Sequence, residues 1–290
     1  MIVAIKESKP HIPYEFLFKY FAVSSSGFYD WRRRAEGPCF TKKCEIQSQI
    51  KEIFKMSKST YGSPRVYSEL KDRGIIVSEN TVATYMKEMG LDARLKKKYR
   101  VMTTDSNHTH PIAERLFKVE EEHCLPTSPG EVLAGDITYL KLSKHNHVYL
   151  AVVIDLFNRE VVGWSMSRSL ESQLVIDALS AAMHAVGPDA EVIFHSDRGS
   201  QYASEAYRKL LKSREIKPSM SRKGNCYDNS YVESFFSSLK KECVYRHDFK
   251  TEEELRALVF EYIEVWYNRK RKHSSLGFLS PVNYKNLNCR

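Results

Sequence analysis

Three acidic residues lie where their side chains could act together on one reaction. Asp136 is inside the alternating apolar run VLAGDITYLKL, which predicts a strand, and Asp197 directly follows a second short apolar run in EVIFHSDRGSQY. An aspartate is a poor strand residue and is rarely buried without a partner. Glu233 lies beside the apolar stripe of a predicted helix. Carboxylate oxygens from two strands and one helix edge are the ligands that magnesium prefers.

Such a cluster of acids suits phosphodiester displacement. Two divalent ions about 4 Å apart can stabilise both the attacking and the leaving oxygen. We therefore expect Asp136, Asp197 and Glu233 to bind two magnesium ions, with manganese as a substitute. Lys240 follows Glu233 by two helical turns, roughly 10 Å along the same side of the helix. It could hold a phosphate of the same polyanion. For this helix by itself, the alternative is a solvated charge pair on the surface.

Hydrophobic periodicity predicts the elements that position these acids. The Glu233 helix has its apolar residues at helical spacing, namely Val232, Phe235, Phe236, Leu239 and Cys243. Before it we expect strands at 132–142, 147–156, 159–168, 191–195 and 216–220. We expect helices at 171–186 and 203–214. Three strands followed by alternating helices and strands predict a mixed sheet flanked by helices. Asp155, at a strand end, is interpreted as a structural acid.

The N-terminal part predicts two helix-turn-helix units, in domains 1–40 and 41–100. In the first, Phe16, Leu17, Tyr20 and Phe21 are expected to form the inner face of one helix, and the next helix ends in three arginines. In the second, a helix at 42–58 precedes one that begins near Pro64 and one capped by Ser78. A plain helical scaffold without DNA contacts is the alternative for both units.

The remaining domains follow from changes in composition. Residues 101–130 lack periodicity and are expected to form a linker, 131–247 the catalytic core, and 248–290 a C-terminal helix and basic tail packed on that core. His108, His110, His123 and Cys124 invite a zinc interpretation, but the six cysteines include no closely spaced pair, so we expect no zinc site.

The flanking sequences identify a family resemblance. Thirty-five residues separate Asp197 from Glu233, and the surrounding words read GDITYL, VVIDLFNREVVGWSM, FHSDRGSQY, SRKGNCYDNSYVESFFSSLKKE and YNRKRKHSSLGFLSP. This constellation resembles the DDE triad of transposases and retroviral integrases. It is most similar to the catalytic protein of bacterial insertion sequences, encoded by the second reading frame of two-frame elements. The resemblance covers essentially the whole chain and is most specific over 132–284.

The resemblance implies an α/β fold, with an RNase H-like integrase core of five strands behind small all-α helix-turn-helix domains. It implies a DNA transposase that binds terminal inverted repeats and catalyses metal-dependent strand cleavage and strand transfer. The expected partners are double-stranded DNA of the element ends and the target, and a homodimer or larger synaptic complex. The resemblance leaves open whether the chain acts alone or with a first-reading-frame partner, either separate or fused to it. The alternatives are an RNase H-like nuclease and a catalytically silent DNA-binding repressor.

Composition agrees with a partner of opposite charge. The net charge is +9 over 290 residues, which suits a polyanion. The chain has no apolar run of about 18 residues and no secretory signal at its start, so we expect a cytoplasmic, nucleoid-associated bacterial protein without a membrane partner. The candidate DNA contacts are Lys240, Arg222, Lys223, Arg198, Arg32, Arg33, Arg34, Asn80, Thr81, Thr84, Lys96, Lys97, Lys98, Arg269, Arg271 and His273.

Overall fold

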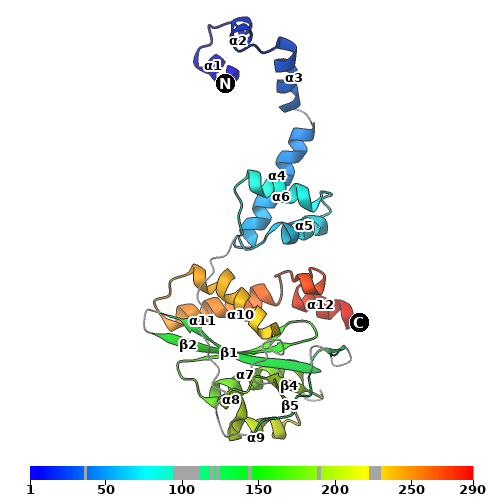
Figure 1. The fold of residues 1–290 in the computed structure, drawn as a ribbon, viewed down its shortest axis with the longest axis vertical. Helices are drawn as coiled ribbons and strands as arrows, with labels where there is room; N and C mark the ends of the chain where they lie inside the picture. Colours follow the sequence, from blue (N-terminus) through cyan, green and yellow to red (C-terminus); the bar gives the residue numbers. More distant parts are fainter. Residues whose placement is uncertain are drawn as a thin grey trace. The chain divides into compact units, whose positions relative to one another are not determined.

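The computed structural model describes residues 1–35, 38–93, 111–117, 121, 125–142, 146–187, 191–221 and 230–289. The chain divides into two compact units, Met1–Ala93 and Arg94–Arg290. Figure 1 shows that the first unit is helical and that the second is built around a sheet. The finer domain boundaries expected from the sequence stay predictions. No helix among the described residues is long and apolar enough to cross a membrane.

The first three helices share a small aromatic core. They are α1 (Ile2–Ser8), α2 (Tyr14–Tyr20) and α3 (Ser25–Ala35). Leu17 and Phe18 of α2 are buried against Phe28 of α3, with the Phe18 and Phe28 ring centroids 5.0 Å apart. The predicted inner face was therefore partly wrong, because Phe16 and Tyr20 are exposed and Phe18 is buried in their place. Periodicity alone left the face of this seven-residue helix ambiguous, and the rings of α3 decided it.

The next three helices lie where the second helix-turn-helix unit was expected. They are α4 (Pro38–Met56), α5 (Ser63–Asp72) and α6 (Glu79–Glu88). Ile50 of α4, Val66 of α5 and Val82 of α6 are fully buried. The Ser78 side chain accepts a hydrogen bond from the Thr81 backbone N–H at 3.1 Å, which is the predicted cap of α6.

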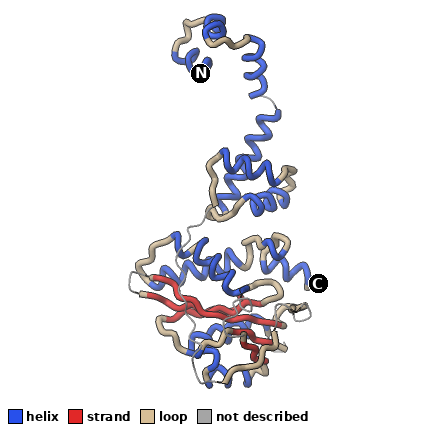
Figure 2. The backbone as a smooth tube through the Cα atoms, viewed as in Figure 1, coloured by secondary structure: helices blue, strands red, loops and turns tan. Residues whose placement is uncertain are grey.

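The second unit contains the mixed five-stranded sheet. The strands are β1 (Val132–Lys141), β2 (His147–Asp155), β3 (Val161–Ser167), β4 (Ile193–Ser196) and β5 (Lys217–Met220). Their order is β3-β2-β1-β4-β5. β2 is antiparallel to both β1 and β3, whereas β4 runs parallel to β1 and β5 runs parallel to β4. Figure 2 shows the sheet between two helical layers. The expected fold class is confirmed.

Each face of the sheet has its own helical layer and its own hydrophobic core. One layer contains α7 (Ser172–Val186), α8 (Ser200–Ala203) and α9 (Glu205–Ser213). The other contains α10 (Ser230–Glu242), α11 (Glu252–Phe260), the π-helix Glu261–Tyr267 and α12 (Pro281–Asn288), as Figure 1 shows. Two single 3₁₀ turns, Val244–Arg246 and Ser274–Leu276, complete this layer.

Close backbone approach and edge pairing fix the outer strands. A Cβ on Gly163 of β3 would lie 2.3 Å from the Ala178 carbonyl oxygen, so only glycine lets α7 pack this closely. On the outer edge of β3, the Asn268 side chain bonds both the N–H and the carbonyl of Val161, each at 3.0 Å. On the outer edge of β5, the hydroxyl of Ser219 accepts from the backbone of Leu116. Part of the expected linker, residues 111–117, therefore packs on the sheet.

Candidate active site

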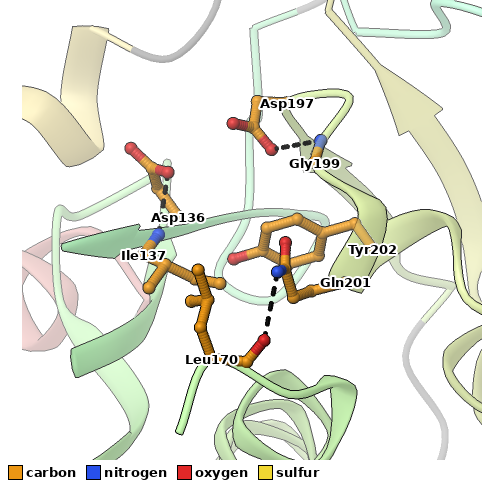
Figure 3. A pocket seen from close by; sticks show the side chains of 7 residues that line it. All are labelled: Asp136, Ile137, Leu170, Asp197, Gly199, Gln201 and Tyr202. Atoms are coloured by element: carbon orange, nitrogen blue, oxygen red, sulfur yellow. Dashed lines mark hydrogen bonds between the residues drawn. The ribbon is translucent and has the colours of Figure 1, made fainter. Parts of the chain in front are cut away.

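Two of the predicted acids lie side by side because of the register of two parallel strands. Gly135 of β1 pairs with Ser196 of β4, so the residues that follow them, Asp136 and Asp197, leave neighbouring strands at the same level. Asp136 Oδ1 accepts from the Ile137 backbone N–H at 2.8 Å. Asp197 Oδ1 accepts from the Gly199 backbone N–H at 2.9 Å. Backbone hydrogen bonds thus hold both carboxylates, as Figure 3 shows.

A small hollow lies beside these carboxylates. Its lining is Asp136, Ile137, Leu170, Asp197, Gly199, Gln201 and Tyr202. In Figure 3 the ring of Tyr202 lies beneath the two acids, while the Gln201 side chain donates to the Leu170 carbonyl at 3.2 Å. Burial raises the pKa of Tyr202 well above its usual value, and the charges of Asp136 and Asp197 raise it further. The phenol therefore stays neutral. Neither Gln201 nor Tyr202 was predicted as a site residue, although each lies within five positions of Asp197.

Glu233, from the other helical layer, lies near enough to Asp136 for its charge to act on that residue. It is half-buried in the first turn of α10, and its negative charge acts on Asp136. Burial is the largest cause that raises the pKa of Asp136 well above its usual value, and the charges of Asp197 and Glu233 add to it. The hydrogen bond from Ile137 and the positive charge of Lys240 act in the opposite direction. The charges of Asp197 and Glu233 thus act on the partly buried carboxylate of Asp136.

Lys240 is anchored on the strand that carries Asp136. Its ammonium donates to the Thr138 hydroxyl at 2.6 Å and lies 4.8 Å from the centroid of the Tyr139 ring. Burial lowers the pKa of Lys240 to about 8, and the charge of Asp136 opposes this shift. The seven-residue spacing therefore places Glu233 and Lys240 along β1, so both face the acidic site.

The donor set fits a hard divalent cation. Within the described ranges, no three side chains of the metal-binding types converge closely enough to hold an ion as they stand. The three acids nevertheless offer only carboxylate oxygens, and their mutual repulsion at Asp136 is the kind that a bound cation relieves. The residues present therefore fit magnesium better than a softer metal.

Two of the predicted DNA contacts are contradicted by the structure. Arg271 is buried and donates two hydrogen bonds to the buried Glu242 carboxylate, at 2.6 and 2.8 Å. His273 is also buried, with its ring 4.8 Å from that of Tyr267. The prediction was wrong for both residues because the basic run YNRKRKH is exposed at Arg269 and Lys270 and buried from Arg271 onward. Arg269 stays exposed and donates to the Glu264 carbonyl.

The other candidate contacts differ in accessibility. Arg32 and Arg33 on α3 and Asn80 and Thr84 on α6 are exposed, and Thr81 is half-buried, with its hydroxyl 2.8 Å from that of Ser78. Half-buried Arg198 donates to the Ser221 carbonyl at 2.8 Å. The remaining candidates lie outside the described residues or, for the first of them, have no described side chain: Arg34, Lys96, Lys97, Lys98, Arg222 and Lys223.

Two further polar residues of the sheet have structural partners. Asp155 is buried and accepts from the backbone N–H groups of Gly130 at 2.8 Å and Phe157 at 2.9 Å, so its structural interpretation is confirmed. His195 is buried in β4, and its Nδ1 lies 2.9 Å from the Ser219 hydroxyl. The ring of His195 also packs against that of Phe117.

Comparison with known proteins decides the family. An integrase core domain model matches residues 126–226, a second integrase core domain model matches 233–288, and an HTH-like domain model matches 42–99. Transposase InsF for insertion sequence IS3A, from Escherichia coli K12, is 42% identical over 92% of this chain and 91% of its own length. The chain belongs to the insertion-sequence transposases of the DDE superfamily. It is therefore a DNA transposase, a polynucleotidyl transferase with an integrase catalytic core.

Further comparisons give lower sequence identities. The uncharacterized 31 kDa protein of insertion element IS600, from Shigella sonnei, is 37% identical over 91% of this chain and 96% of its own length. The HTLV-2 integrase catalytic core domain in complex with magnesium is 17% identical and gives a TM-score of 0.43 over 55% of this chain and 97% of its own. A simian T-cell lymphotropic virus intasome chain is 14% identical, with a TM-score of 0.47 over 81% of this chain and 74% of its own.

Proposed function

We propose that this transposase cleaves and joins DNA at the ends of its own element, with Asp136, Asp197 and Glu233 as its metal-binding acids. The observation that carries the proposal is the convergence of charge at Asp136. One neighbouring acid comes from the adjacent strand and the other from a helix more than thirty residues later, and both raise its pKa. Acids brought together at such a cost in repulsion are typical of a cation site.

When bound, two magnesium ions would activate the attacking oxygen and stabilise the leaving 3′-oxygen. Asp136, whose pKa is raised by the charges of both other acids, would hold these ions together with Asp197 and Glu233. Lys240, fixed by Thr138, would orient a phosphate next to the scissile bond. Its pKa of about 8 keeps it mostly protonated at neutral pH. The buried ring of Tyr202 excludes water from beneath the carboxylates.

The helical unit would recognise the DNA sequence of the element end. We propose that α6 enters the major groove of the terminal inverted repeat, because Asn80 and Thr84 are exposed on it whereas Thr81 is occupied at the cap. Arg32, Arg33, Arg198 and Arg269 would contact phosphates, which position a protein without reading sequence. Both element ends must meet, so we propose a complex of at least two copies. The first-reading-frame partner and the nucleoid location stay predictions.

Strand cleavage and joining on a fragment that carries the element end, in magnesium and in manganese, test this function. We expect Asp136→Asn, Asp197→Asn and Glu233→Gln each to lower both activities at least about a thousandfold, while binding to the end is retained. Glu191→Gln is the matched control, because Glu191 is an exposed acid that pairs with Lys217 and precedes β4, whereas Asp197 follows this strand. Near-normal activity in any of the three variants would remove that acid from the site.

A further inference from the structure

The turn between β2 and β3 holds an arginine in a backbone conformation that arginine disfavours. Arg159 has φ +65°, in the left-handed region where glycine or asparagine is preferred. The turn is closed by hydrogen bonds from Asp155 N–H to the Glu160 carbonyl and from Arg159 N–H to the Asp155 carbonyl, both 2.8 Å. A side chain retained in a conformation with such a steric cost is expected to make a contact that offsets it.

That contact is with the ring of Tyr231. The central carbon of the Arg159 guanidinium lies 3.5 Å from the ring centroid of Tyr231. The Nη1 atom of this guanidinium is buried and meets no hydrogen-bond acceptor in the part of the chain that the structure describes. The aromatic face therefore takes the place of an acceptor, since a planar guanidinium stacks well on a ring.

Tyr231 is part of the helix turn that presents Glu233. The two residues are two positions apart in the first turn of α10, so their side chains leave the helix about 200° apart. Glu233 acts on Asp136, and Tyr231 therefore faces away from the acids, towards the β2–β3 turn. The buried residues Val232 and Phe235 hold the helix on the sheet from a third direction.

We propose that Arg159 is a positioning residue for strand cleavage and joining: by clamping Tyr231 it fixes the first turn of α10 and so aims Glu233 at the site. The inference rests on the metal-binding role proposed for Glu233. Asp136 and Asp197 are held by the sheet itself, whereas Glu233 depends on where a helix terminus lies. A displacement of a reacting group by about 1 Å can lower a rate by roughly a hundredfold, so a clamp at this turn matters for chemistry more than for folding.

The decisive variant is Arg159→Gly in the full chain. Glycine removes the backbone strain, so we expect an unchanged or higher unfolding temperature together with unchanged binding to the element end. Strand cleavage should fall roughly ten- to a hundredfold, and its half-saturating magnesium concentration should rise. Independently of activity, amide hydrogen exchange in residues 231–236 of the metal-free protein should become faster. If Arg159 only stabilised the fold, cleavage and hydrogen exchange would change together with the unfolding temperature.

Four further variants provide the controls. Glu215→Gly makes the same backbone change at another non-glycine residue with positive φ, +56°, whose side chain is exposed in the turn before β5, and should leave cleavage unchanged. Arg159→Lys retains the cation and Tyr231→Phe retains the ring, so both should keep most of the activity. Tyr231→Leu should behave like Arg159→Gly.

Two results would overturn the clamp. One is wild-type cleavage with wild-type exchange in Arg159→Gly. The other is a drop in its unfolding temperature large enough to account for the lost cleavage. Glu233→Gln, run in the same assay, keeps the two proposals apart. If that variant is active, the role of Glu233 fails. If it is inactive while Arg159→Gly matches the wild type, only the clamp fails.

Discussion

Helix α10 carries two clusters of charged side chains that differ in their balance. Towards β1, Glu233 and Lys240 join Asp136 and Asp197, so three acids face one ammonium. Near its C-terminal end, the Glu242 carboxylate is matched by the Arg271 guanidinium, and Glu242 also accepts from the Tyr262 hydroxyl at 3.0 Å. The first cluster is half-buried and the second is buried. Among the described residues, acids outnumber cations in the first cluster, whereas the second pairs one carboxylate with one guanidinium.

The difference separates structural charge from functional charge. A buried carboxylate with a bidentate guanidinium and a phenol donor has no need of a further ligand, so it can serve the fold. A group of acids with too few cations is destabilised by its own repulsion and is expected to gain from a bound metal ion. The balance of charge around an acid, more than its burial, therefore distinguishes the two roles.

The largest effect is expected in the balanced cluster. Arg271→Met leaves the Glu242 carboxylate buried without its cation and should lower the free energy of unfolding by about 3–5 kcal/mol. Urea unfolding followed by tryptophan fluorescence measures this loss. The double variant Glu242→Gln/Arg271→Met should recover more than half of it, because no uncompensated charge remains. Arg269→Ala, at the exposed neighbour, should stay within about 0.5 kcal/mol of the wild type. A single variant as stable as Arg269→Ala would contradict the structural role of the pair.

A smaller effect concerns Asp155, a buried acid whose hydrogen bonds come from backbone N–H groups. Burial raises the pKa of Asp155 from 3.8 to about 6, against the bonds from Phe157 and Gly130. The folded protein therefore keeps this proton to higher pH than the unfolded chain does. The stability that Asp155 contributes is complete below pH 3.8 and is lost as the pH rises through 6.

The measurement is chemical unfolding of the wild type and Asp155→Asn across this pH range. Asparagine does not titrate, so the variant should gain on the wild type between pH 3.8 and 6, by on the order of 2 kcal/mol, and the difference should level off above that range. A difference between the two proteins that stays constant with pH would show that burial of Asp155 does not govern its proton.

The smallest effect on stability is expected in the cluster of Asp136, Asp197 and Glu233. Its sign is opposite to that of Arg271→Met, because the variant should be more stable than the wild type. Asp136→Asn removes one of three repelling charges and keeps an oxygen for the Ile137 N–H, so the metal-free protein should gain on the order of 1 kcal/mol in stability while activity is lost. Magnesium should raise the unfolding temperature of the wild type and leave that of the variant unchanged. A less stable variant in the absence of metal would mean that the acids do not repel one another.

Much of the site could be predicted from local patterns. Alternation placed Asp136 inside β1, a short apolar run placed Asp197 directly after β4, and the stripe around Val232 placed Glu233 on the edge of α10. These features repeat with the period of the element that forms them, so neighbouring residues report them. The cap at Ser78 was predictable for the same reason, since its partner is three residues away.

Residues whose surroundings come from distant segments could not be predicted in this way. Arg271 looked like a surface cation until Glu242, from another helix, was brought against it. Phe16 was predicted to face inward, but Phe18, two positions later, is the ring that packs against Phe28. Tyr202 lines a pocket with Asp136 and Asp197 because the pairing of β1 with β4 brings these two acids together.

The sequence by itself determined the family, the order of strands and helices, and the three acids with their spacing, because these are written in local periodicity and in fixed words of the chain. Only the tertiary structure decided which charges face each other. Burial and Coulomb energy depend on distances across the sheet and between helices, and such distances do not exist until the chain has folded. The clamp between Arg159 and Tyr231, which are 72 positions apart in the sequence, is of this second kind.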